Sequence, residues 1–329
     1  MDFKVITYGE VGLEEIVTNG ISSGHIPGGS ALNIATALTR LGVNAAIVSP
    51  YNSEAVPSIV VNSRMHSLGV NQSLLVESDK ALPVIKHVIS DDGEVETRYF
   101  IGSSTQEDWD LIDLRDGPKD GDVLVINGTL AFGDGPMAKV YDTLFKVGSK
   151  FHTIIFDPNI RPQLIKDIDE AKERFDNWVS QSTIVKASAE DIKWRYPELS
   201  IEEVGALLLE QGPAIVVITN GREGSHIFSR SGQFAMPAIE IDQKDFINQI
   251  GVGDAFTAGL VKWLIANDMT AKAEIEQISG LQSLDLLLRS SEYSSSICKT
   301  SGTNFDPVTP NEVPVLHRLR VIDGGASAN

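Results

Sequence analysis

Cysteine, long apolar runs and positive charge are all scarce in this 329-residue chain. Cys298 is the only cysteine, which excludes an intramolecular disulfide and a metal site built from several cysteines. No apolar run approaches the length needed to span a membrane. The 27 Lys and Arg residues are outnumbered by 45 Asp and Glu residues. The resulting net charge of −18 argues against a broad nucleic-acid-binding surface.

The sequence also lacks an internal repeat, a low-complexity linker and the G-x-x-x-x-G-K-[ST] pattern of a P-loop. Residues 1–7 have the character of a strand start rather than of a signal peptide. We therefore expect a cytoplasmic protein with neither a membrane nor a nucleic-acid partner. One domain spanning residues 1–329 is expected, because large α/β folds accommodate this length, and the small polar residues 324–329 are expected to fray.

Short, mostly β-branched runs alternate with helical periods along the chain. Strands are expected at 5–8, 45–48, 123–126, 153–156, 183–186 and 214–219, and helices at 31–41, 56–68, 137–147, 168–178 and 201–210. This alternation predicts an α/β fold in which helices cover both faces of a mostly parallel central sheet. Ligands of such sheets bind beyond the carboxyl ends of the strands.

A different pattern interrupts this alternation near residue 90. Residues 83–89 and 94–101 alternate apolar and polar side chains on either side of Asp92-Gly93, a hairpin turn signal. We expect a small antiparallel β lid, formed from about 11–27 and 83–103, that also makes a homodimer contact. Phe100 is expected to pack over the ligand from this lid. The alternatives are that Phe100 only fills the lid and that the hairpin is an edge feature without a function.

Gly251-Val252-Gly253-Asp254 precedes a helical stretch and is the most informative segment. Glycines let backbone N–H groups approach a ligand, and a helix N-terminus attracts an anion. An aspartate would repel a phosphate there, unless it takes a proton from the hydroxyl that attacks the phosphate. The segment therefore indicates phosphoryl transfer to an alcohol, with Asp254 as the general base. Helix capping by Asp254 is an alternative.

A Rossmann dinucleotide site is a further alternative for the same glycines. It is disfavoured because Phe256 occupies the place of the third glycine and because the motif lies far from the first strand. A second glycine pair, Gly28-Gly29, opens an earlier helix and is followed by Asn33. Paired glycines allow a close approach of a ligand, and the Asn33 amide can both donate and accept hydrogen bonds toward sugar hydroxyls.

Taken together, these segments resemble the ribokinase-like (PfkB) family of carbohydrate kinases. The family patterns G-G-x-x-x-N-x-A and G-A-G-D match residues 28–35 and 251–254. Residues 157–162 resemble the D-P-N-x-R segment of fructokinases and 2-keto-3-deoxygluconate kinases, and residues 186–191 the K-x-[NS]-x-x-E segment. Residues 219–224 resemble the T-x-G-x-x-G segment of the nucleotide site. Gly302, Pro307 and Pro310 resemble the closing segment.

The resemblance implies a ribokinase-like three-layer fold and an ATP-dependent sugar kinase that uses Mg²⁺. The implied acceptor is a hydroxyl of a fructose-like ketose or of a keto-deoxy sugar acid. Asp254 would be the base, and the N–H groups of Gly251, Val252 and Gly253 would hold the transferred phosphoryl. Implied sugar ligands are Glu14 (or, with a one-residue shift, Glu15), Gly28, Gly29, Asn33 and Arg161, with Phe100 above them. Implied nucleotide-site residues are Lys186, Ser188, Thr219, Gly221 and Gly224, and Asp191 is implied to organise Mg²⁺ through water.

Four positions depart from the family pattern. Asn248, Gln249 and Val252 replace the Asp, Thr and middle Ala of D-T-x-G-A-G-D, and Asp191 replaces a Glu. The loss of the Asp and the Thr argues against activation by a monovalent cation. Two other functions remain open. One is a nucleoside kinase of the same fold, and the other is a catalytically decayed homologue that senses a sugar or a nucleotide.

Overall fold

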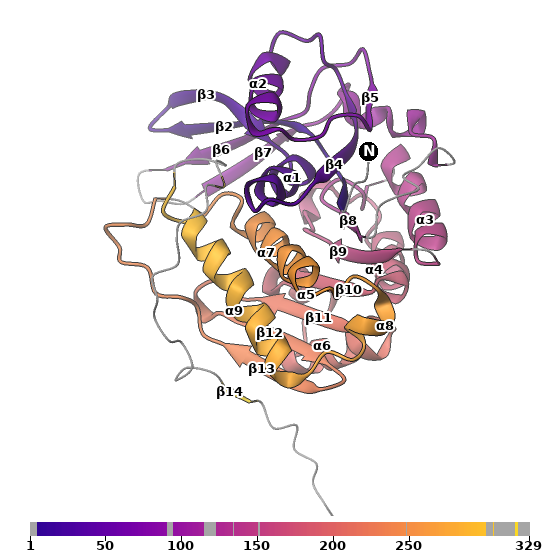
Figure 1. Ribbon diagram of the computed structural model, residues 1–329. Coiled ribbons are helices and arrows are strands. Elements are labelled where there is room, and N and C mark those ends of the chain that lie inside the picture. The colour runs from indigo at the N-terminus through magenta and orange to yellow at the C-terminus, as the bar shows by residue number, and fades with distance from the viewer. Residues whose placement is uncertain are drawn as a thin grey trace, which may run out of the picture.

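The computed structural model describes residues 5–90, 95–114, 123–133, 135–150, 152–247, 249–300, 305 and 320–321. Within these residues a 10-stranded sheet has the order β14-β13-β12-β11-β10-β9-β8-β1-β4-β5 (Figure 1). Its strands are β1 (Val5–Tyr8), β4 (Ala45–Tyr51), β5 (Leu75–Glu77), β8 (Val123–Asn127), β9 (Thr153–Asp157), β10 (Ile184–Ser188), β11 (Ile215–Thr219), β12 (Ser225–Ser229), β13 (Gly232–Met236) and β14 (Arg320–Val321). Neighbouring strands from β5 to β11 pair in parallel, whereas β12, β13 and β14 extend the sheet in antiparallel pairs.

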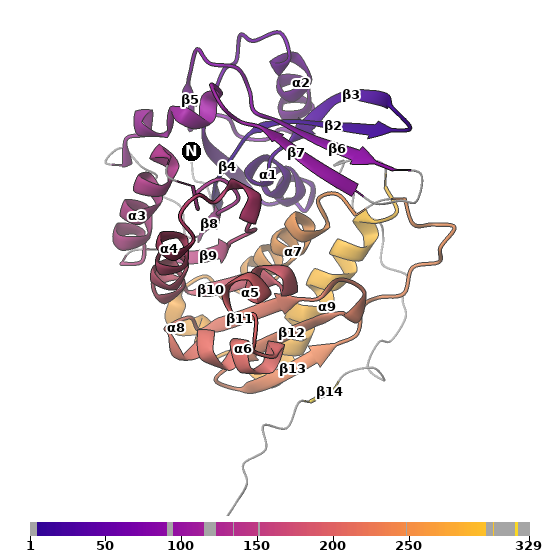
Figure 2. The same ribbon diagram turned by 180° about the vertical axis from the view of Figure 1, so that it is seen from behind.

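Helices cover both faces of this sheet, as the strand–helix alternation predicts. One face carries α1 (Ser30–Arg40), α2 (Ser58–Leu68), α7 (Val252–Ala266), α8 (Lys272–Ile275) and α9 (Gly280–Ile297). The other carries α3 (Pro136–Gly148), α4 (Ile168–Gln181), α5 (Ala189–Arg195) and α6 (Ile201–Glu210), which lie toward the viewer in Figure 2. Short 3₁₀ turns connect these elements at η1 (Thr105–Glu107), η2 (Trp109–Leu111), η4 (Pro162–Leu164) and η5 (Gly221–Glu223). The fold is therefore a three-layer α/β arrangement.

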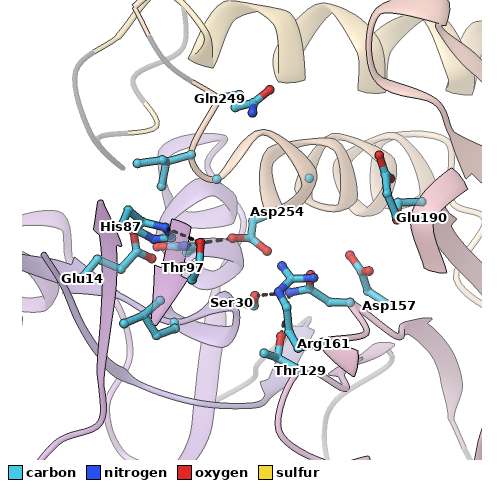
Figure 3. A pocket seen from close by; sticks show the side chains of 18 of the residues that line it. Glu14, Ser30, His87, Thr97, Thr129, Asp157, Arg161, Glu190, Gln249 and Asp254 are labelled. Atoms are coloured by element: carbon cyan, nitrogen blue, oxygen red, sulfur yellow. Dashed lines mark hydrogen bonds and ion pairs between the residues drawn. The ribbon is translucent and has the colours of Figure 1, made fainter. Parts of the chain in front are cut away.

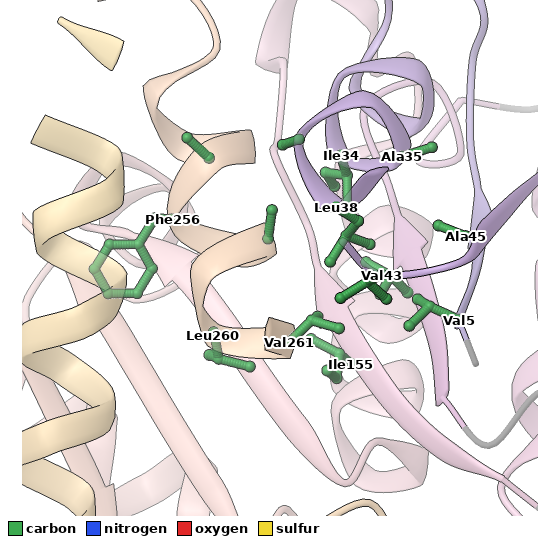
Figure 4. Close-up of a cluster of buried hydrophobic side chains, with 14 of the residues drawn as sticks. Val5, Ile34, Ala35, Leu38, Val43, Ala45, Ile155, Phe256, Leu260 and Val261 are labelled. Atoms are coloured by element: carbon green, nitrogen blue, oxygen red, sulfur yellow. The ribbon is translucent and has the colours of Figure 1, made fainter. Parts of the chain in front are cut away.

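Each central strand contributes side chains to two separate apolar cores. In β1, Val5 faces the core under α1 and α7, whereas Ile6 and Tyr8 face the core under α3 and α4. Since successive side chains of a strand point to opposite faces, a strand buried on both faces becomes apolar throughout. Figure 4 shows the first core, where side chains of α1 and α7 lie next to each other. This packing brings the starts of the two helices together.

A second, four-stranded sheet has the order β3-β2-β6-β7 within the described residues. Its strands are β2 (Gly12–Thr18), β3 (Ile21–Gly28), β6 (Val84–Ile89) and β7 (Val95–Phe100). β2 pairs with β3, and β6 with β7, in the predicted antiparallel way, while β2 and β6 run parallel to each other. The turn signal Asp92-Gly93 lies outside the described residues. The small sheet joins two segments that are far apart in the sequence.

Several expected features cannot be compared with the structure. Asn248, the closing-segment residues Gly302, Pro307 and Pro310, and the tail at 324–329 lie outside the described residues. In the part of the chain that is described, no helix has both the length and the apolar character needed to cross a bilayer.

Candidate active site

A cavity of about 840 Å³ lies at the carboxyl ends of the parallel strands and reaches the small sheet. Asp157 enters it from the end of β9, Ser188 from the end of β10 and Thr219 from the end of β11. Figure 3 shows Glu14, His87, Arg161 and Asp254 around this space, each from a different element. The cavity therefore occupies the edge at which ligands of parallel sheets bind.

Asp254 lies in the first turn of α7, which begins after Gly251 in the left-handed region at φ 76°. Its side chain is nearly enclosed and accepts a 2.8 Å hydrogen bond from Asn33 Nδ2. Burial raises the pKa of Asp254 to about 7, and the Asn33 hydrogen bond opposes that shift. A carboxylate with this pKa can accept a proton near neutral pH. Gly251 and Gly253, at the start of α7, line the same cavity, whereas Val252 does not.

Glu14, on β2, is buried in the same cavity. Burial raises the pKa of its carboxyl group to about 7, although the Gly29 N–H and the Asn33 amide lower it. Its Oε2 atom accepts no hydrogen bond within the described chain, and His87 Nε2 lies 3.9 Å from it. This oxygen is available to a ligand that brings a hydrogen-bond donor.

Gly28 and Gly29 play different parts in this arrangement. Gly29 lines the cavity, whereas Gly28 does not belong to its lining. A Cβ atom at Gly28 would lie 2.6 Å from Glu14 Oε1. The structure therefore does not bring Gly28 into the cavity where the sequence predicts a sugar contact, and the Glu14 carboxyl group fills the space that a side chain at Gly28 would take.

The small sheet contributes Tyr99 rather than the expected Phe100. Tyr99, Thr97 and His87 line the cavity, and His87 Nδ1 lies 3.1 Å from Thr97 Oγ1. Phe100 is 56% exposed and is absent from the lining. Since successive residues of a strand point to opposite faces, Tyr99 and Phe100 cannot both face the cavity. The structure therefore favours Tyr99 over the expected Phe100 as the residue of β7 that faces a ligand.

Glu10 is a buried acid of the cavity to which sequence reasoning assigned no role. It follows β1, and its Oε1 atom accepts a 3.3 Å hydrogen bond from the Ser30 N–H. Its Oε2 atom accepts none within the described residues. Burial raises the pKa of Glu10, while the charge of Arg161, another lining residue, lowers it. Its place after a central parallel strand is the signal that could have identified it.

The expected nucleotide-site residues lie along two adjoining cavities. Lys186, Ser188, Thr219 and Gly221 line the first cavity, and Gly224 lines a second one of about 700 Å³. The two cavities share the lining residues Thr219, Gly221, Arg222, Phe246, Gln249 and Gly253. The second cavity is bordered by Val252 and by serines of α9. An elongated ligand can therefore extend from α9 to Asp254.

Asp191, the expected metal-side residue, is largely engaged by protein donors. Its Oδ1 atom accepts from the Ile160 N–H at 2.6 Å, and its Oδ2 atom accepts from the N–H and the hydroxyl of Ser188, each at 2.8 Å. Asp191 thus caps α5. Asp157 Oδ1, in contrast, is buried in the cavity and has no hydrogen-bond partner among the described residues. No group of three His, Cys, Asp or Glu side chains within the described ranges forms a metal-binding cluster.

Known proteins resemble this chain in sequence and in fold. The chain is 24% identical over 252 residues to a fructokinase of Rhizobium leguminosarum bv. trifolii, covering 76% of this chain and 75% of the relative. Its fold matches that of the ATP-bound fructokinase of Xylella fastidiosa with a TM-score of 0.80, at 17% identity, over 92% of this chain and 94% of the other. It also matches a Vibrio cholerae O395 fructokinase bound to fructose, ADP and calcium, with a TM-score of 0.76 at 19% identity, over 97% and 99% of the two chains. The model of the pfkB family of carbohydrate kinases matches residues 1–309, and the chain therefore belongs to this family.

Proposed function

We propose that this carbohydrate kinase transfers the γ-phosphoryl group of ATP to a hydroxyl of a fructose-like ketose, with Asp254 as the general base. The observation that carries the proposal is the buried Asp254 carboxyl group, which is oriented by Asn33 and has a pKa raised to about 7. In the reaction, a bond forms between the acceptor oxygen and the γ-phosphorus, and the bond from that phosphorus to the β–γ bridging oxygen breaks. ADP leaves with the electron pair, and the acceptor proton passes to Asp254.

The charge of the cavity favours a neutral ketose over a keto-deoxy sugar acid. Glu10 Oε2 and Glu14 Oε2 are buried and accept no hydrogen bond within the described chain, and Asp157 and Asp254 line the same space. Sugar hydroxyls would satisfy these oxygens as donors, whereas a substrate carboxylate would be repelled by them. Arg161 is the cation next to Glu10, and that acid partly offsets its charge. The fructose of the Vibrio structure supports the same acceptor class.

ATP would extend from the second cavity toward Asp254, with its terminal phosphate at the start of α7. The N–H groups of Gly251 and Gly253, at the start of α7, would stabilise negative charge there, whereas the Val252 N–H donates a 3.4 Å hydrogen bond to the Gln249 carbonyl and would have to release it to take part. Mg²⁺, when bound, neutralises charge on the phosphates. The buried Asp157 Oδ1 atom, which lacks a partner within the described chain, fits a cation that prefers oxygen ligands, and Asp191 would act through water. Gln249 lines both cavities where the family has a Thr, which supports a site without monovalent-cation activation.

A coupled assay of ADP release tests this function with ATP, Mg²⁺ and three acceptors: fructose, 2-keto-3-deoxygluconate and a nucleoside. We expect turnover stimulated by fructose, and a loss of about 10²- to 10⁴-fold in kcat for Asp254→Asn. Asp169→Asn, on the exposed start of α4, is the matched control and keeps wild-type turnover. Turnover with the nucleoside alone would make the protein a nucleoside kinase. A lack of turnover with all three acceptors, or an Asp254→Asn variant that keeps its activity, would contradict the proposed reaction.

We also propose that the small sheet forms a homodimer contact. Ile21 and Phe100, both on this sheet, are large apolar side chains exposed by 75% and 56%. Burial of such side chains in a second subunit would be favourable. Sedimentation analysis should give twice the 35.6 kDa mass of one chain. Phe100→Ser should shift the equilibrium toward the single chain, and a wild-type mass of one chain at assay concentration would refute the contact.

A further inference from the structure

Lys186 is a buried cation beside the proposed phosphoryl-transfer site. It lies near the end of β10, is only 4% exposed and lines the first cavity. A lysine side chain is almost never fully buried unless its charge is paired. Its partner in the structure is Asp157 Oδ2, 3.0 Å from Lys186 Nζ.

This ion pair is connected to α7 by a third side chain. The Thr257 hydroxyl, one turn after Asp254, donates a 2.8 Å hydrogen bond to the same Asp157 Oδ2 atom. Asp157 thus joins the ammonium group of β10 to the first turns of α7. Because the three elements converge on one carboxylate oxygen, the position of the Lys186 ammonium is fixed relative to Asp254.

The ammonium group points toward the start of α7. A Cβ atom built on Gly253 would lie 3.4 Å from Lys186 Nζ, which places the ammonium beside Gly253 at the proposed anion site. An ammonium has three donors, and within the described chain only the one toward Asp157 is used in a hydrogen bond. The remaining donors are available to an anion held at the start of α7.

The surrounding carboxylates make a fixed cation necessary at this point. Asp157, whose Oδ2 atom lies 3.0 Å from Lys186 Nζ, lines the cavity together with Asp191 and Asp254. A phosphoryl group arriving at Asp254 would meet these three acids. Without a cation, the backbone donors would have to offset all of that negative charge.

We infer that Lys186 is a catalytic residue which contacts the transferring phosphoryl group, and that Asp157 and Thr257 position it. The inference rests on the proposed kinase reaction but assigns a role that the reaction alone does not require. Lys186 would act on charge that develops during transfer, rather than hold the nucleotide uniformly in its ground state. Its loss should therefore lower kcat more than it weakens the binding of ADP or sugar.

The test compares Lys186→Met with Lys193→Met, an exposed lysine on α5. Removing one donor from a preorganised anion site lowers kcat by about 10²- to 10³-fold, and we expect this loss for Lys186→Met alone. The KM for the sugar and the Kd for ADP should change by less than about threefold. Fluoroaluminate, a mimic of the transferring phosphoryl group, should tighten ADP binding to the wild-type protein in the presence of sugar. Lys186→Met should lose this tightening.

Lys186→Met leaves Asp157 buried without its cation, which threatens folding. The double variant Lys186→Met/Asp157→Asn removes both charges and is compared with Asp157→Asn alone, because Asp157 is also the proposed Mg²⁺ ligand; this comparison carries the test if the single variant does not fold. Thr257→Val should retain the ammonium and lose only about tenfold in kcat. A kcat of Lys186→Met within about threefold of wild type, or of the double variant within about threefold of Asp157→Asn, would overturn the inference. The inference would also be overturned if Lys186→Met weakened ADP binding by as large a factor as it lowered kcat. A wild-type protein inactive on every acceptor would instead refute the proposed reaction.

Discussion

Asn33 and Asp254, 221 positions apart in the chain, are joined by a 2.8 Å hydrogen bond from Asn33 Nδ2 to Asp254 Oδ2. The bond connects the first turn of α1 with the first turn of α7, two helices that pack against each other in the first core (Figure 4). The hydrogen bond fixes the rotation of the carboxyl group, and the Asn33 amide does not donate to the other oxygen, Asp254 Oδ1. The apolar contact between the two helices thus determines the orientation of the proposed base.

Asn33→Ala should move the acid limb of the kcat–pH profile to higher pH. The Asn33 amide lowers the pKa of Asp254, so its removal raises a pKa that is already about 7. A hydrogen bond to a charged group contributes about 1.5–3 kcal/mol, which corresponds to a shift of roughly one pH unit or more. The kcat of the variant should be low at pH 6.5 and should recover at pH 9. Asn177→Ala, an exposed residue of α4, is the control, and an acid limb that stays in place would contradict the assigned hydrogen bond.

Asp254→Asn should stabilise the protein at alkaline pH. The folded pKa of Asp254 is about 7, above its ordinary value of 3.8, so between these values the folded state binds more protons than the unfolded state. Stability from this group is therefore lost as the pH rises from about 4 to 7, and the ionised form is the unfavourable one. The variant removes a penalty on the order of 4 kcal/mol at pH 8 and about 2 kcal/mol at pH 5.5. Thermal unfolding at both pH values measures this difference, with Asp169→Asn as control. A Tm of Asp254→Asn below that of the wild-type protein at pH 8 would refute this prediction.

Gly28→Ala should weaken sugar binding by displacing Glu14. The added Cβ atom would lie 2.6 Å from Glu14 Oε1, so the carboxyl group must move. We expect a loss of about 1–3 kcal/mol in stability and a KM for the sugar that rises more than the KM for ATP. Gly135→Ala is the control, because a Cβ atom at Gly135 meets nothing within 4 Å. Equal KM values for the sugar in the two variants would mean that Glu14 is not a sugar ligand.

Tyr99→Ala and Phe100→Ala should separate the two faces of strand β7. Tyr99 lines the cavity, and its removal should raise the KM for the sugar about tenfold, or about 1.4 kcal/mol. Phe100 is exposed on the other face, and its removal should leave that KM unchanged. Steady-state kinetics of both variants, with the sugar concentration varied, show which face of β7 contacts the sugar. A larger effect of Phe100→Ala than of Tyr99→Ala would restore the original expectation from the sequence.

The parallel core of the fold was accessible from the sequence because its strands are buried on both faces. The run at 123–126 predicts a strand from β-branched content alone, and β8 spans Val123–Asn127. The antiparallel strands β12 and β13 at the edge of the sheet were not predicted. They are short and contain Ser, Gly and Gln, so neither an apolar run nor a clear alternation marks them.

Some residues of the candidate site were likewise predictable from the sequence, and others were not. The start of α7 was predicted from the glycine spacing, and Gly251, the residue before the helix, has a left-handed φ that favours glycine. The choice between Tyr99 and Phe100 could not be made, because a shift of one residue in strand register exchanges the two faces. The place of Glu10 in the cavity and the position of Lys186 beside Gly253 depend on which strand ends are neighbours. The sequence does not give the order of the strands in the sheet.

The parallel pairing of β2 with β6 has a mechanical consequence. The ladder runs from Leu13–Val84 to Thr18–Ile89, so one continuous set of backbone hydrogen bonds carries both Glu14 and His87. These two residues cannot change their separation without breaking that ladder. Any tilt of the small sheet over the cavity would therefore carry Glu14, the proposed sugar ligand, together with the neighbouring His87. A displacement that exposes the cavity would also move the Glu14 carboxyl group away from it.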